Sequence, residues 1–276
     1  MSVPALDLLA GWPVPHPSAG VLAAGHPHPL ATGGDTRRRH RWASVTKLCT
    51  ALAVLVAVEE GTLDLDEAAG PPGATVRHLL AHASGLTFDD DRVVAEPGRR
   101  RTYSNSGYRV LGATLARRAG MPFDRYLTEA VLEPQGLVDT RLEGSPAAGL
   151  VGPLDDLLRL ASELLAPTLV SRDILGMATT VAFPGLAEIL PGLGRHDPLD
   201  WGLGFEVRDR KSPHWTGTRN SAATFGHYGA SGSFLWVDPE AGLACAALTG
   251  REFGPWALTA WPAFSDAVLD EFAGAV

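Results

Sequence analysis

Apolar residues recur at helical spacing through the middle of the chain, which predicts a mainly helical central region. The strongest pattern covers residues 44–61, with Ser44 as the expected N-cap and Gly61 as the C-terminal stop. Apolar side chains lie on all sides of this segment, so the helix is expected to be buried. Further helices are predicted at residues 4–10, 76–82, 106–119, 122–132, 154–165, 172–180 and 255–272.

Segments with strand character lie near both ends of the chain. Two short strands are predicted before the buried helix and four after residue 200, at residues 19–24, 29–33, 201–207, 222–228, 231–237 and 242–249. The last two are joined by a turn of the sequence DPEAG, which is typical of a hairpin.

This order of elements predicts an α+β fold. One antiparallel sheet is built from both termini and flanked by helices, and a helical lobe is inserted into it. We expect residues 1–62 and 200–276 to form the α/β lobe and residues 63–199 the helical lobe. A cleft between the two lobes is where a functional site is expected.

Composition and charge narrow the class of function. The 276 residues are 45% apolar with a net charge of −8, which argues against nucleic acid or an anionic membrane as a partner. No apolar stretch approaches the roughly 20 residues of a membrane span, and the first residues have no basic segment typical of an export signal. The two cysteines, Cys49 and Cys245, lie in apolar segments and suit buried thiols. We therefore expect a cytoplasmic location.

The first candidate for chemistry is Ser44-Val45-Thr46-Lys47, an S-x-x-K sequence at the start of the buried helix. Basic residues here are almost all arginine, and Lys47 and Lys211 are the two lysines of the chain. A lysine amine can lose its proton when buried, whereas arginine cannot. At a spacing of three, the Lys47 amine can reach the Ser44 hydroxyl, as a base reaches a nucleophile. The alternative is an N-capping serine followed by an ordinary lysine.

Two more segments carry candidate residues. Tyr103-Ser104-Asn105 precedes a predicted helix, where Tyr103 could share in proton transfer and Asn105 could hold the substrate or Lys47. His227-Tyr228-Gly229 lies near a strand end, where His227 and the free amide of Ala230 could bind a substrate carbonyl. The alternatives are a helix-entry turn and a structural histidine.

Cofactor motifs are absent from the sequence. His78 and His82 are four residues apart and could grip a metal ion from one helix face, but no glutamate follows His78 as in the H-E-x-x-H motif. There is no G-x-G-x-x-G segment or P-loop lysine, so no nucleotide cofactor is implied. The G-x-S-x-G nucleophile elbow of α/β-hydrolases is also absent. We expect neither a metal nor another cofactor.

Together the three motifs resemble the serine β-lactamase and penicillin-binding superfamily, in particular its class C-like branch of DD-peptidases, cephalosporinases and related esterases. The connecting phrases are also similar to that branch: HRWASVTKL, VRHLLAHASGL, EPGRRRTYSNSGYRVLG, LEPQGLVDT and WGLGFEV. The resemblance covers about residues 40 to 250 and implies a β-lactamase/transpeptidase-like fold.

By position, the resemblance implies a role for each candidate residue. Ser44 would be acylated, with Lys47 and Tyr103 moving its proton and Asn105 contacting the substrate. The amides of Ser44 and Ala230 would form the oxyanion hole. Hydrolysis of the acyl-enzyme would complete the reaction.

The chain also departs from the family pattern. The third motif is His227-Tyr228-Gly229 where β-lactamases usually have K-T-G, so a neutral histidine replaces the cation that commonly holds a substrate carboxylate. The separation between Ser44 and Tyr103 is short for the family, and a class A deacylating glutamate has no match. We therefore expect an esterase-like serine hydrolase that cleaves a small-molecule ester or amide.

Two alternatives remain open at the level of sequence. One is a β-lactamase or D-peptidase, and the other is a catalytically silent penicillin-recognising or ligand-binding protein. Substrate choice is expected to depend on the loops at residues 86–101 and 184–213. The sequence does not specify the oligomeric state.

Overall fold

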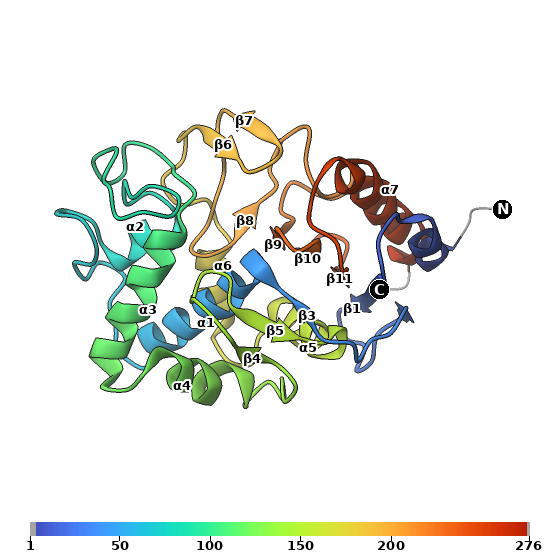
Figure 1. Cartoon of the computed structure of the whole chain (residues 1–276), viewed down its shortest axis with the longest axis horizontal. Coiled ribbons are helices and arrows are strands. Elements are labelled where there is room, and N and C mark those ends of the chain that lie inside the picture. The colour runs from blue at the N-terminus through green and yellow to red at the C-terminus, as the bar shows by residue number, and fades with distance from the viewer. Residues whose placement is uncertain (1–3, 275–276) are drawn as a thin grey trace.

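The computed structural model describes residues 4–274 and has a six-stranded antiparallel sheet at its centre. The strand order is β2-β1-β11-β10-β9-β8, so the first two strands of the chain lie beside the last (Figure 1). The strands are β1 (Ser18–Ala23), β2 (Ala31–Gly33), β8 (Glu206–Val207), β9 (Phe225–Gly229), β10 (Ser233–Asp238) and β11 (Leu243–Leu248). The expected α+β fold with a sheet from both termini is confirmed.

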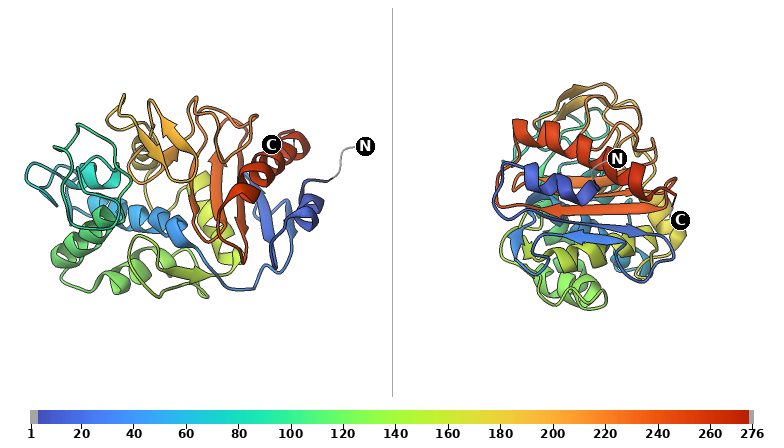
Figure 2. Two further views of the ribbon diagram at one scale, coloured as in Figure 1. Left: turned by 45° about the horizontal axis from the view of Figure 1, so that its top comes forward. Right: turned by 90° about the vertical axis from the view of Figure 1, so that its right-hand side faces the viewer.

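Both faces of the sheet are buried because apolar side chains point to either side of each central strand. In β11, Cys245 packs in one hydrophobic core, whereas its neighbours Ala244 and Ala246 pack in the other. The first core is covered by α7 (Pro255–Phe272) and the short helix η1 (Ala5–Gly11). The second is covered by α5 (Leu154–Leu165) and α1 (Thr46–Glu59), and Figure 2 shows α5 and α7 on opposite sides of the sheet.

The remaining elements lie mainly between β3 and β8 along the chain. The longer helices are α1 (Thr46–Glu59), α3 (Asn105–Ala119) and α5 (Leu154–Leu165). The shorter ones are η2 (Ala43–Val45), α2 (Val76–Leu80), α4 (Phe123–Leu127), η3 (Thr128–Leu132) and α6 (Arg172–Ala178). Two small sheets join β3 (His40–Arg41), β4 (Arg141–Leu142) and β5 (Leu150–Gly152), and β6 (Glu188–Leu190) with β7 (Gly194–His196).

The prediction that Ser44 caps the buried helix is wrong. Ser44 lies inside the short 3₁₀ helix η2, and α1 begins two residues later at Thr46. Val45 is the residue before α1, and no side chain caps this helix end. The Ser44 hydroxyl is therefore not engaged by the helix amides.

The predicted strand at residues 201–207 is reduced to the two residues of β8. The chain turns back on itself before β8, and Trp201 forms an isolated bridge with Glu206. Gly204 has a φ of 103°, which L side chains rarely adopt, and a Cβ at this position would collide with Ala51 of α1. The turn therefore depends on the close packing of Gly204 against α1. The alternation of apolar residues at 201–207 does not reveal this contact.

The expected division into lobes at residues 1–62, 63–199 and 200–276 stays a prediction. One helix inside the middle segment, α5, packs against β1, β10 and β11 of the sheet.

Cys49 and Cys245 are free and buried, as expected, and burial raises the pKa of both thiols. Among the helices of residues 4–274, none is long and apolar enough to cross a membrane.

A buried ionic cluster holds β8 to the segment that follows it. The Glu206 carboxylate accepts hydrogen bonds from Lys211 Nζ at 2.8 Å, His214 Nε2 at 2.9 Å and Trp215 Nε1. Burial by itself would raise the pKa of Glu206, but His214 and Lys211 lower it below the ordinary value. The depressed pKa means that the folded state favours the ionised carboxylate.

We expect Glu206→Gln to lower the free energy of unfolding by about 3–5 kcal/mol at pH 7, because it leaves the buried Lys211 without its anion. A depressed carboxyl pKa contributes stability above the pKa of the unfolded chain, near 4.3, and this stability is lost as the pH falls toward the folded-state pKa. Urea unfolding at pH 7 and pH 3, followed by tryptophan fluorescence, should give a smaller difference at pH 3. The exposed Glu240→Gln serves as a control, and equal losses in the two variants would contradict the role of the cluster.

Candidate active site

Ser44 and Lys47 lie close together because η2 runs directly into the first turn of α1. Lys47 Nζ is 3.3 Å from Ser44 Oγ, and the Lys47 side chain is fully buried. The start of α1 is tied to a distant loop, since Thr46 Oγ1 accepts the Leu150 amide and Thr50 Oγ1 donates to Pro146 O. This attachment places the carbonyl of Ala147 over the Lys47 amine.

The Lys47 amine has two further partners besides Ser44. It donates to Asn105 Oδ1 at 2.7 Å and to Ala147 O at 2.9 Å. Burial lowers the pKa of Lys47 well below the ordinary lysine value, and the Asp89 charge opposes this only in part. An amine with such a pKa loses its proton far more readily than an exposed lysine does, so it can accept the proton of a hydroxyl beside it.

Tyr103 and Asn105 are positioned by the start of α3. Ser104 is the N-cap of this helix, and its Oγ accepts the amide of Gly107 at 2.9 Å. The two flanking side chains then point to the same place, Asn105 to Lys47 and the Tyr103 ring beneath the Lys47 amine at 4.7 Å. Burial raises the pKa of the Tyr103 phenol, while its hydrogen bond with Ser44 acts in the opposite direction. The phenol is therefore held in its protonated form.

His227 is buried on β9 and contacts Tyr103 rather than open solvent. Its Nδ1 accepts the Tyr228 amide at 2.8 Å, and its Nε2 lies 3.1 Å from the Tyr103 hydroxyl. Burial, followed by the Lys47 charge, lowers the pKa of His227 to about 3, so the ring is neutral at pH 7. A neutral ring that accepts at Nδ1 carries its proton on Nε2 and donates it to Tyr103. The Tyr103 proton is then free to point toward Ser44.

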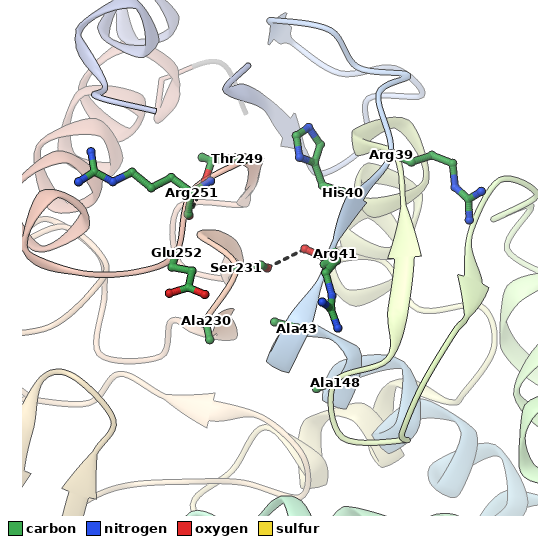
Figure 3. Close-up of a pocket in the computed structure, with 11 residues that line it drawn as sticks. Arg39, His40, Arg41, Ala43, Ala148, Ala230, Ser231, Thr249, Arg251 and Glu252 are labelled. Carbon is green, nitrogen blue, oxygen red and sulfur yellow. Dashed lines mark hydrogen bonds between the residues drawn. The ribbon is translucent and has the colours of Figure 1, made fainter. Parts of the chain in front are cut away.

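The turn after β9 is fastened to the segment that carries Ser44. Ser231 Oγ donates to Arg41 O at 2.6 Å, as Figure 3 shows, and Ser233 Oγ donates to Trp42 O at 2.7 Å. Gly229 packs so closely on this segment that a Cβ would collide with Trp42 O. Glycine is therefore required at residue 229 to let β9 approach Ser44.

The amides of Ser44 and Ala230 are both available to a ligand. Among the backbone hydrogen bonds of residues 4–274, neither amide donates to a carbonyl, whereas Ala230 O accepts the Phe253 amide at 2.9 Å. Two free amides beside one hydroxyl can stabilise negative charge on a carbonyl oxygen that the hydroxyl attacks.

These groups open into a cavity of about 300 Å³, which we call the apolar cavity. Its lining includes Ser44, Tyr103, His227 and Ala230 together with residues that the sequence did not identify as candidates for the site. These are Phe88, Leu190, Pro191, Gly192, Tyr228, Glu252 and Phe253. The first four come from the loops at 86–101 and 184–213 that were expected to control substrate choice.

His82 is a further residue that the sequence did not connect to the site. It is buried, and its Nδ1 accepts the Ser104 amide at 3.1 Å while its carbonyl accepts the Thr102 amide at 2.7 Å. The two bonds hold the backbone on both sides of Tyr103, and the His82 ring lies 4.6 Å from the Tyr103 ring. Burial and then Lys47 lower the pKa of His82 well below its ordinary value, which keeps Nδ1 an acceptor.

His78 and His82 do not form a metal pair. His78 Nδ1 accepts the Thr75 amide and its ring stacks on Phe183, whereas His82 points to Tyr103. Across residues 4–274 there is no group of three or more His, Cys, Asp or Glu side chains arranged to hold a metal ion.

Comparisons with known proteins point to one family. A model described as Beta-lactamase matches residues 9–267, which is most of the chain. A solved structure of a beta-lactamase from Mycobacterium bovis is 55% identical, with a TM-score of 0.95 over 98% of this chain and 99% of that chain.

More distant proteins are similar over shorter or less conserved stretches. Penicillin-binding protein 4* of Bacillus subtilis (strain 168) is 27% identical over 133 residues, which are 36% of this chain and 30% of that protein. The matched region thus spans less than a third of that curated relative. EstCE1, a hydrolase with promiscuous acyltransferase activity, has a TM-score of 0.78 at 19% identity, over 96% of this chain and 97% of that chain. This likeness shows a shared fold.

Proposed function

Because this chain belongs to the beta-lactamase family, we propose that it is a serine hydrolase that cleaves a small-molecule ester or amide through an acyl-Ser44 intermediate. One observation carries the proposal. The buried amine of Lys47, with its lowered pKa, lies 3.3 Å from Ser44 Oγ at the wall of the apolar cavity. Ser44 and Ala230, whose amides are free, line this cavity, and the Lys47 base reaches Ser44 from behind the lining. No cofactor is part of the proposal.

In the proposed acylation step, neutral Lys47 accepts the proton of Ser44 Oγ as the oxygen attacks the substrate carbonyl. The pKa of Lys47 is lowered and that of Tyr103 is raised, which favours Lys47 as the base. The amides of Ser44 and Ala230 stabilise the oxyanion as it forms.

Tyr103 then delivers a proton to the leaving group. Its hydroxyl accepts from His227 and is held protonated by burial, so it can donate while Lys47 restores its proton. Asn105 holds the Lys47 amine in place at 2.7 Å, and we propose that it also contacts the substrate. Water attacks the acyl-enzyme in the second step, with the same groups moving its proton.

The lining of the apolar cavity favours an esterase-like activity over the alternatives. Its one charged side chain is the Glu252 carboxylate, and His227 stands neutral at the third motif. A β-lactamase or D-peptidase has a carboxylate in its substrate, which gains nothing from such a lining. A silent binding protein would not need Ser44 and Lys47 within reach of each other.

The free, buried Cys49 and Cys245 are consistent with the cytoplasmic location that we propose.

Intact-protein mass spectrometry tests this proposal directly. Wild type and Ser44→Ala are incubated separately with p-nitrophenyl acetate and with benzylpenicillin, and the mass of the protein is followed with time. We expect an acetyl adduct on wild type alone and little or no penicilloyl adduct. A stable or turned-over penicilloyl adduct would favour the lactamase alternative. The absence of both an adduct and Ser44-dependent release of p-nitrophenolate from folded wild type would contradict the proposal.

His82 is expected to act as a positioning residue for Tyr103. His82→Ala removes both the acceptor for the Ser104 amide and the ring that packs against Tyr103, so kcat should fall about 10–100-fold with little change in KM. His82→Asn should retain most of kcat, because asparagine offers an acceptor and tolerates the φ of 55° found here.

The measurement is the split between kcat and KM for both variants, with melting temperatures recorded in parallel. Equal losses of kcat in the two variants, or losses that follow the melting temperature alone, would mean that His82 has only a structural role.

A further inference from the structure

The lining of the apolar cavity includes a single side chain with a formal charge. Among its lining residues, the Glu252 carboxylate is charged, while His227 is kept neutral by burial. Lys47 is not part of the lining, because its amine is turned toward Ser44, Asn105 and Ala147. A ligand in the apolar cavity therefore meets negative charge and no cation.

A second cavity lies beside the first and shares Ala230 and Glu252 with it (Figure 3). We call this space, of about 520 Å³, the lateral groove. Glu252 lines both spaces, so a substrate group that extends into either space meets this residue. Ala230, whose amide is proposed to bind the oxyanion, lies next to it in Figure 3.

The arginines of the lateral groove form no ion pair with Glu252. Arg39 is paired with Glu143 at 3.1 Å, and Arg251 donates to Pro13 O at 2.6 Å and points away from the groove in Figure 3. Arg41 lies on the opposite wall of the groove and does not line the apolar cavity. Among the ion pairs of residues 4–274, none includes Glu252.

We propose that Glu252 sets the substrate class of this site, selecting esters whose groups next to the reacting carbonyl are uncharged or cationic and rejecting those that carry a carboxylate there. The inference rests on the proposed hydrolase function and deepens it. A carboxylate in the apolar cavity would lose its hydration without gaining a counter-ion, and it would be repelled by Glu252. An apolar chain would instead pack on Phe88, Leu190 and Phe253.

The test compares two p-nitrophenyl esters with the same chain length and different charge. p-Nitrophenyl valerate has a neutral chain, and mono-p-nitrophenyl glutarate has a terminal carboxylate in place of the methyl group. For wild type we expect kcat/KM to be at least about tenfold higher for the valerate, from like-charge repulsion at short range. The ratio should be larger at 10 mM than at 1 M salt, because the screening length falls from about 30 Å to about 3 Å.

Four variants assign this ratio to a residue. Glu252→Gln should reduce the valerate-to-glutarate ratio by about tenfold, and Glu252→Lys should favour the glutarate. Glu240→Gln removes the same charge from the exposed turn between β10 and β11, so it should leave the ratio as in wild type. Arg41→Gln should leave the ratio the same or raise it.

The outcomes separate the two proposals. A ratio that does not change in Glu252→Gln, or that falls equally in Glu240→Gln, overturns the role of Glu252 while the acetyl adduct on Ser44 still supports the hydrolase. A preference for the glutarate in wild type also overturns it. If p-nitrophenyl acetate leaves no adduct on Ser44 and releases no p-nitrophenolate in a Ser44-dependent reaction, the hydrolase proposal fails, and the specificity proposal fails with it.

Discussion

Ser44→Ala is expected to lower kcat/KM for p-nitrophenyl acetate by at least about 10⁴-fold, the largest effect of any single change in this chain. The substitution removes the atom that forms the acyl-enzyme, and Lys47 and Tyr103 cannot act on a substrate without it. The fold should be retained, because the Ser44 hydroxyl is only partly buried and does not cap α1. Initial rates with purified wild type and variant measure the loss.

Circular dichroism and the melting temperature provide the control for Ser44→Ala. Both should match wild type closely, because no buried apolar group or ion pair is removed. A variant that is folded and retains more than about a tenth of the wild-type rate would exclude Ser44 as the nucleophile.

Substitution of Lys47 should have the second-largest effect, a loss of about 10²–10⁴-fold in kcat/KM. Lys47→Met keeps the length of the side chain and removes the base. Lys47→Arg keeps a cation and its hydrogen-bond donors, but arginine cannot release its proton at any pH at which the protein is folded. If Lys47 acts as a base, both variants lose activity, whereas a purely electrostatic role would be preserved in Lys47→Arg.

The pH profile of wild type gives an independent measure of the same role. Because the neutral amine is the reactive form, kcat/KM should rise with pH through the pKa of Lys47, which burial places well below the ordinary lysine value. This rising limb should be absent from Lys47→Arg. Activity of Lys47→Arg within tenfold of wild type, with the limb unchanged, would contradict Lys47 as the base.

The relation between Ser44 and Lys47 could be predicted because it is local. Residues three apart at a helix start share a face, so the spacing alone brings hydroxyl and amine within reach. The conformation at Ser44 was not predicted correctly, because Ser44 lies inside the 3₁₀ helix η2 and is not the N-cap of α1. That difference depends on the contacts that Gly229 and Ser233 make with the segment before Ser44, which come from the other end of the chain.

The elements of the fold were predictable in proportion to their length and periodicity. The helix at residues 255–272 and the strands near 231–248 have clear patterns of apolar residues in the sequence. The structure contains them as α7, β10 and β11. Strands of two or three residues, such as β3 and β6, are too short to show alternation. The segment at residues 201–207 alternates like a strand, yet close packing of Gly204 on α1 turns it back.

The sequence by itself determined the family resemblance, the sheet from both termini, and the candidate set of Ser44, Lys47, Tyr103 and Asn105. Tertiary structure alone brought His227, 124 residues from Tyr103, within 3.1 Å of the Tyr103 hydroxyl. It also decided that Glu252 carries the charge of the apolar cavity. Spacing along one element encodes contacts between near neighbours. Contacts between distant segments depend on how β9, α3 and the β6–β7 hairpin pack, and no local pattern specifies this packing.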